Sequence, residues 1–137
     1  MARFILLILS LSMFAGCSGS RDKQEKKEAD PNQSLYEKVM GVHDEVMPRM
    51  DEIHKLKRQL EETIKNSKDL AAEKRKELEQ KIALLDSASK AMMNWMYEFR
   101  PEELKGDSLR MYLEKEMDRV TKVKELVLEA IKKASEE

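Results

Sequence analysis

Methionine and histidine are the side chains of this sequence whose type and spacing suit chemistry. Thioether sulfur and imidazole nitrogen bind soft metal ions such as Cu(I), and an indole ring adds a cation–π contact to a bound cation. If the chain folds back on itself near residues 67 and 103, these side chains gather at one end of a helical bundle. This Met/His set consists of Met40, His43, Met47, Met50, His54, Met92, Met93, Trp95, Met96 and Met111.

Three interpretations of the Met/His set remain open. Methionine fills irregular space in protein cores, so the set can be core packing around a bend at Pro48. Met-rich faces also form adaptable surfaces that bind a partner helix or an apolar ligand. The third interpretation is a copper site, in which Met40, His43, Met92 and Met96 converge on Cu(I). We favour core packing over the other two.

Sequence motifs for catalysis are missing. The sequence contains no glycine-rich phosphate loop, no cysteine pair for zinc and no Gly-x-Ser-x-Gly elbow. His43 and His54 are 11 residues apart, which separates them by about 16 Å along a helix and keeps them from binding one ion. A net charge of −1 provides no basic face for nucleic acid. We therefore expect a non-enzymatic protein without a cofactor, with copper as the alternative.

The composition favours helices as the elements that position the Met/His set. The chain has 137 residues, of which 39% are charged and 5% aromatic, with only four glycines and three prolines. Such a chain lacks the turn residues and the β-branched or aromatic strands of a sandwich or barrel. We therefore expect an all-α fold.

Start and stop signals divide the chain into three helices, over about 34–66, 69–98 and 108–134. Ser34-Leu35-Tyr36-Glu37 matches a capping box at the start of the first helix. Pro48 falls on the polar side of that helix and predicts a bend, whereas Pro101 and Gly106 separate the second helix from the third. The short connections predict an antiparallel three-helix bundle over residues 34–137, monomeric and distinct from a long intermolecular coiled coil.

Apolar residues recur at spacings of three and four along each predicted helix and define the expected core. In chain order they are Leu35, Val39, Val42, Val46, Met50, Ile53, Leu56, Leu60 and Ile64, then Ala71, Leu78, Ile82, Leu85, Ser89, Met92, Met96 and Phe99, then Leu109, Leu113, Met117, Val120, Val123, Val127, Ile131 and Ala134.

The first 17 residues carry a targeting signal. Residues 4–15 are an apolar run of 12 residues, shorter than the roughly 20 that a membrane-spanning helix needs. The run ends in Phe14-Ala15-Gly16-Cys17, which resembles the lipobox of bacterial lipoproteins. That resemblance implies cleavage of a signal peptide over residues 1–16 and acylation of Cys17, the only cysteine of the chain. Ser18 after the cysteine resembles the sorting pattern for the outer membrane.

Between the lipobox and the first helix, residues 17–33 predict a flexible tether. Residues 18–33 contain no large aliphatic or aromatic side chain and no methionine, and their charges balance. Such a segment cannot form a core and does not provide a basic lipid-binding arm.

The part that follows the tether resembles small helical lipoproteins of Bacteroidota-type bacteria, some of which are labelled as similar to viral A-type inclusion proteins. The resemblance rests on the segments His43-Asp44-Glu45-Val46-Met47-Pro48 and Met92-Met93-Asn94-Trp95-Met96. It implies an envelope lipoprotein and assigns no catalytic residue. The sequence therefore predicts a helical bundle, anchored in the outer membrane through Cys17, that serves as a structural element or interacts with an envelope protein. The alternative function is a periplasmic copper-binding lipoprotein.

Overall fold

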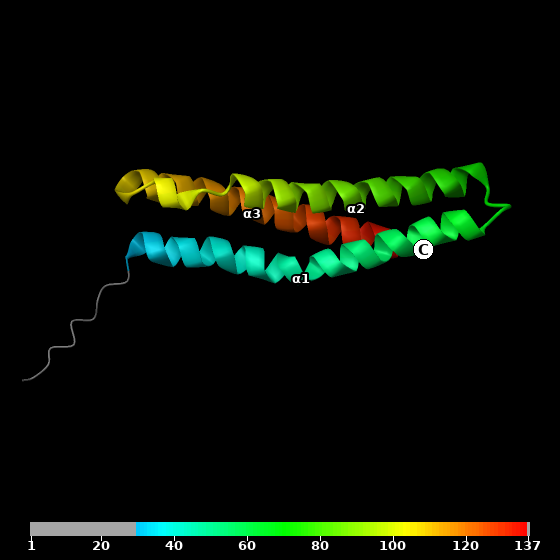
Figure 1. Cartoon of the computed structure of the whole chain (residues 1–137), viewed down its shortest axis with the longest axis horizontal. Helices are drawn as coiled ribbons and strands as arrows, with labels where there is room; N and C mark the ends of the chain where they lie inside the picture. Colours follow the sequence, from blue (N-terminus) through cyan, green and yellow to red (C-terminus); the bar gives the residue numbers. More distant parts are fainter. Residues whose placement is uncertain (1–29, 137) are drawn as a thin grey trace, which may run out of the picture.

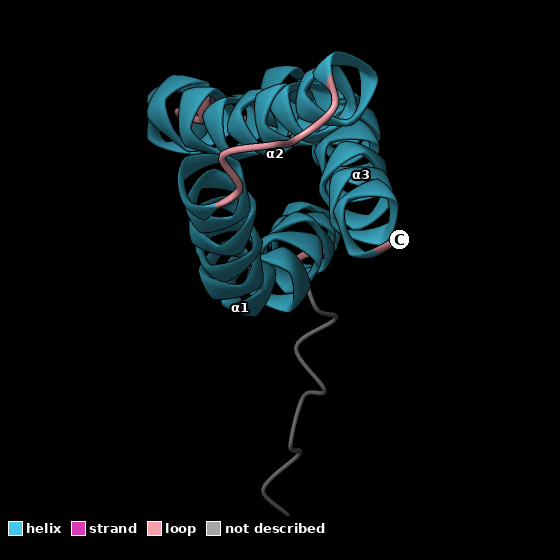
Figure 2. Ribbon diagram, turned by 90° about the vertical axis from the view of Figure 1, so that its right-hand side faces the viewer, coloured by secondary structure: helices cyan, strands magenta, loops and turns pink. Residues whose placement is uncertain are grey.

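Three long helices make up the part of the chain that the structure, a computed structural model, describes, residues 30–136. They are α1 (Pro31–Asn66), α2 (Ala72–Glu98) and α3 (Gly106–Ser135), with a short 3₁₀ turn, η1 (Pro101–Glu103), between the last two. α2 runs antiparallel to α1 and α3 (Figure 1). Each helix packs against both others, as the view along the bundle in Figure 2 shows. The predicted all-α three-helix bundle is confirmed.

α1 begins three residues earlier than the sequence predicts. The side chain of Asp30 accepts a hydrogen bond from the backbone N–H of Asn32 at 3.0 Å, so Asp30 is the N-cap. Pro31 occupies the first helical position, where its fixed φ suits the helix and its missing N–H costs nothing. Ser34 therefore lies inside the first turn, and the predicted capping box is wrong. The bundle begins at residue 31, while residues 17–29 of the predicted tether and the lipobox lie outside the described residues.

The other helix starts also differ from the predicted ones. α2 begins at Ala72 instead of residue 69, and Ala71, which we expected in the core, is its exposed N-cap. α3 begins at Gly106, two residues before the predicted start. Gly106 has a φ of 56°, a left-handed conformation that glycine adopts without steric cost. This turn lets the chain enter α3 after the two residues that follow η1, Leu104 and Lys105.

Pro48 bends α1 without ending it. The helix continues on both sides of this residue, whose side chain is exposed. Proline removes one helical hydrogen bond and pushes on the preceding turn. Figure 1 shows α1 bent near its middle, as predicted.

The core follows the predicted stripes closely. Among the expected core residues, Leu85, Met92, Leu113, Val120 and Val127 are completely covered. Every buried side-chain nitrogen or oxygen within residues 30–136 has a hydrogen-bond partner. The full set of buried apolar residues is Val39, Val46, Met50, Ile53, Leu78, Leu85, Ala88, Met92, Trp95, Leu113, Val120, Val123, Val127, Ala130, Ile131 and Ala134.

Adjacent leucines in α2 provide a test of this packing. Leu85 is 0% exposed and Leu84 is 40% exposed. Leu85→Ala should lower the free energy of unfolding by about 2–5 kcal/mol, because it removes buried methyl groups and leaves a cavity. Leu84→Ala is the matched control and should cost clearly less. Urea denaturation followed by circular dichroism measures both, and equal losses for the two variants would contradict the assignment of the core face.

Candidate functional site

The Met/His set divides according to burial. Met50, Met92 and Trp95 are buried in the core. Four residues of the set are half-buried: Met40, His43, Met47 and Met96. The other three, His54, Met93 and Met111, are exposed. Met93 is 57% exposed and Met111 67%. Only part of the set therefore faces the interior, and the three exposed residues do not converge with it.

The fold-back of α2 on α1 brings the predicted partners together. The ring of His43 lies 5.8 Å from the ring of Trp95, measured between centroids. His43 and the segment 92–96 therefore lie at the same end of the bundle, as the predicted turn near residue 67 requires.

The fold-back near residue 103 predicts Met111 at the level of Trp95, and in the structure the Met111 side chain is 67% exposed. Successive residues of a helix are rotated by about 100°, so the neighbouring Tyr112 turns towards α2 while Met111 faces solvent. The ring of Tyr112 lies 6.0 Å from that of Phe99. The contact with Trp95 comes instead from Glu116, one turn further along α3.

An aromatic cluster occupies this end of the bundle. Phe99 is the centre of this cluster. The centroid of its ring lies 4.9 Å from that of Trp95, 6.1 Å from that of Tyr36 and 6.0 Å from that of Tyr112. The three rings that surround Phe99 come from all three helices. The cluster therefore joins α1, α2 and α3 near the α2–α3 connection.

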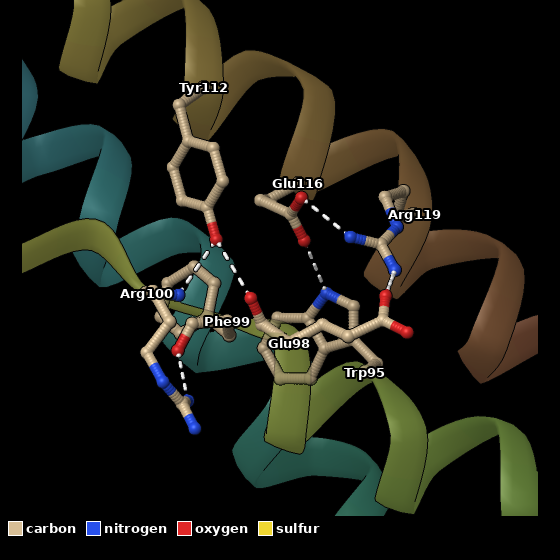
Figure 3. Close-up of polar contacts among 7 residues, drawn as sticks. All are labelled: Trp95, Glu98, Phe99, Arg100, Tyr112, Glu116 and Arg119. Carbon is tan, nitrogen blue, oxygen red and sulfur yellow. Dashed lines mark hydrogen bonds and ion pairs between the residues drawn. The ribbon is translucent and has the colours of Figure 1, made fainter. Parts of the chain in front are cut away.

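A buried carboxylate lies beside the aromatic cluster (Figure 3). Glu116 is only 1% exposed. Its Oε2 accepts a hydrogen bond from Trp95 Nε1 at 2.9 Å, and its Oε1 accepts one from Arg119 Nη1 at 2.8 Å. Arg119 also donates to the carboxylate of Glu98 at the end of α2. The hydrogen bond from Arg119 to Glu116 raises the pKa of the guanidinium further above its ordinary value, so Arg119 remains charged.

Tyr112 ties the α2–α3 connection to α3. Its hydroxyl accepts a hydrogen bond from the backbone N–H of Arg100 at 2.8 Å and donates a longer one, 3.4 Å, to the carbonyl of Glu98 (Figure 3). Partial burial raises the pKa of the Tyr112 phenol above its usual value. The phenol therefore stays protonated and can keep donating.

The sequence analysis missed Glu116, although a signal for it was present. Position 116 follows Leu113 by three residues and precedes Val120 by four, so it falls on the core stripe of α3. We expected Met117 to face inward, whereas it is half-buried. A carboxylate at a core position, opposite a helix with a tryptophan N–H, indicates a buried polar contact.

The donors for a metal ion are limited. His43 Nδ1 lies 2.9 Å from Asp44 Oδ1. Within residues 30–136 there is no group of three His, Cys, Asp or Glu side chains that could hold a metal ion. A copper site would therefore depend on the thioethers of Met40, Met92 and Met96 with the remaining nitrogen of His43.

Exposed apolar side chains mark two other places. Tyr97 is 77% exposed, and the Arg100 guanidinium lies 5.5 Å from the centre of its ring. Further along α2 and α3, Leu84, Ala88, Leu126 and Ala130 help to line a shallow pocket of about 100 Å³. This volume lies below the range of about 300–1,000 Å³ that is typical of small-molecule sites.

No family model, curated protein or solved structure matches this chain. The resemblances noted in the sequence remain predictions. None of the helices in the described part is long and apolar enough to cross a membrane.

Met92 and Met93 test how the Met/His set divides. Met92 is 0% exposed, so Met92→Asp should unfold the domain, because an unpaired charge is strongly disfavoured in an apolar interior. Met93→Asp on the exposed side should leave stability nearly unchanged. Circular dichroism and thermal unfolding measure the difference. A folded Met92→Asp protein of ordinary stability would contradict this arrangement.

Proposed function

We propose that the protein is a non-enzymatic lipoprotein of the cell envelope, anchored in the outer membrane through Cys17. The observation that carries the proposal is the position of the only cysteine, directly after the apolar run and the small residues Ala15 and Gly16. Two or three acyl chains on one residue give stable anchoring, because each buried CH₂ contributes about 0.8 kcal/mol. The bundle then acts outside the bilayer as a structural or protein-binding element.

The start of α1 supports an orientation for this anchored bundle. Asn32 Nδ2 donates to the carbonyl of Gly106 at 3.1 Å, so α1 and α3 begin side by side at the end that also carries η1. Thirteen residues, 18–30, separate Cys17 from α1, and they can reach at most roughly 45 Å when extended. We infer that the end with the aromatic cluster is the one nearer the membrane.

The exposed apolar side chains near this end support an envelope protein as the partner. Tyr97, Met111 and Met93 are the three most exposed large apolar residues of the described part. They lie within five residues of the end of α2 or the start of α3. Tyrosine and methionine are enriched where proteins bind one another. We propose that these side chains contact the partner.

Cys17→Ala tests the anchor. Cells fed labelled palmitate should incorporate label into the wild-type protein, and the variant should lose both the label and its recovery with membranes. Ser20→Ala is the matched control, because it changes a small residue near the lipobox without removing the acylated sulfur. If the Cys17→Ala protein were recovered with membranes as fully as the wild type, the proposal would be contradicted.

Copper binding is the second candidate function. The soft donors Met40, His43 and Met96 are half-buried at one end of the bundle, and Trp95 lies against His43. Thioether and imidazole ligands suit Cu(I). This candidate has less support than protein binding, because Met92 is fully packed in the core and Met93 and Met111 point away from the others.

A Cu(I) titration decides between the two candidates. Under reducing conditions with a competing chelator, we expect the full-length protein to bind no Cu(I) more tightly than about micromolar, because Met92, one of the four donors, is fully packed in the core. His43→Ala and Met96→Ala provide the comparison. Stoichiometric tight binding that both variants lose, with their helicity intact, would establish the copper function instead.

A further inference from the structure

Glu116 is the only charged residue that is buried within residues 30–136. Both of its carboxylate oxygens are occupied, one by a donor from α2 and the other by a donor from its own helix (Figure 3). Arg119 supplies the compensating charge and in turn pairs with Glu98. The buried charge is therefore fully satisfied, and the hydrogen bond from Trp95 is the part of this arrangement that depends on the relative position of α2 and α3.

The apolar stripes of these two helices do not by themselves select that position. Inward positions on both helices repeat at spacings of three and four, and those of α2 near Trp95 are Leu85, Ala88 and Met92. A shift of α2 by one helical turn along α3 places apolar residues against apolar residues again. The connection between them, residues 99–105, has seven residues, and such a shift would also break its hydrogen bond from the Arg100 N–H to the Tyr112 hydroxyl.

The hydrogen bond between Trp95 and Glu116 distinguishes the observed position of α2 from one shifted by a helical turn. A shift of one turn brings Met92 or Phe99 opposite Glu116 in place of Trp95, and neither side chain has an N–H to donate. The carboxylate oxygen would then lack a partner in a water-excluded place, which is strongly unfavourable. Arg119 would lose Glu98 as well, because the two residues come from different helices.

We propose that the Trp95–Glu116–Arg119 network sets the stagger of α2 along α3 and, through the shared aromatic cluster, aligns the three helices at this end of the bundle. Its contribution is the selection of one packing arrangement, distinct from overall stability. Buried polar groups that specify register are a known use of such contacts.

The distance between two spin labels measures the stagger directly. Labels are attached to cysteines that replace Lys90 of α2 and Lys122 of α3, both exposed. The experiment uses the full chain carrying Cys17→Ser, so that no other thiol is present. Pulsed electron paramagnetic resonance then gives the distribution of distances between labels, in which one helical turn corresponds to an axial shift of about 5 Å.

With Glu116 present we expect a single narrow distribution. Glu116→Gln should keep it, because the amide oxygen still accepts from Trp95. Glu116→Leu should give a broadened or divided distribution while the protein stays helical by circular dichroism. Met92→Leu is the matched control, since it exchanges one apolar side chain for another on the same seam, and it should leave the distribution unchanged.

Trp95→Phe keeps the test decisive if Glu116→Leu fails to fold. This substitution removes the indole donor and retains an aromatic ring, so it should also broaden the distribution. A single unchanged distance in the helical Glu116→Leu protein, or in Trp95→Phe where the former does not fold, would overturn the proposal. A lower midpoint of unfolding with an unchanged distance would likewise assign the network to stability alone.

Discussion

Burial of one narrow apolar stripe per helix is the constraint on which this bundle depends. With 39% of its residues charged, the chain can remove only a limited surface from water, and each helix must turn the same side inward along its whole length. The antiparallel course of α2 lets three such stripes meet around a common axis. The bend at Pro48, the left-handed turn at Gly106 and the aromatic cluster all adjust the helices to this shared core.

The periodic pattern explains why the fold could be predicted from the sequence. Inward positions such as Val39, Leu85 and Val120 follow directly from spacing, because a helix repeats every 3.6 residues. Helix ends were less predictable, since competing caps lie close together: Ser34 matches a capping motif, but Asp30 followed by Pro31 provides an earlier start. Local hydrogen bonds of similar strength decide such competitions, and sequence spacing alone does not rank them.

The candidate site was predicted less completely than the fold. The fold-back placed His43 and Trp95 together correctly, because the turn length determines which levels of two antiparallel helices meet. The exposure of Met111 was not predicted, because one residue of rotation separates a core-facing position from solvent. Glu116 was missed because a carboxylate at an inward position is normally read as an interruption of the stripe. The partners of Glu116 are Arg119 in α3 and Trp95 in α2. The spacing of apolar residues does not reveal such polar contacts.

The junction where α1 and α3 begin side by side has a mechanical consequence. A pull on the chain at residue 30 in the direction of the α1 axis loads the contacts of α1 with α3 in shear. The hydrogen bond from Asn32 to Gly106 is the first tertiary contact to bear that load. Force transmitted from α1 to α2 at this end passes through the aromatic cluster, in which Phe99 stacks on both Tyr36 of α1 and Trp95 of α2.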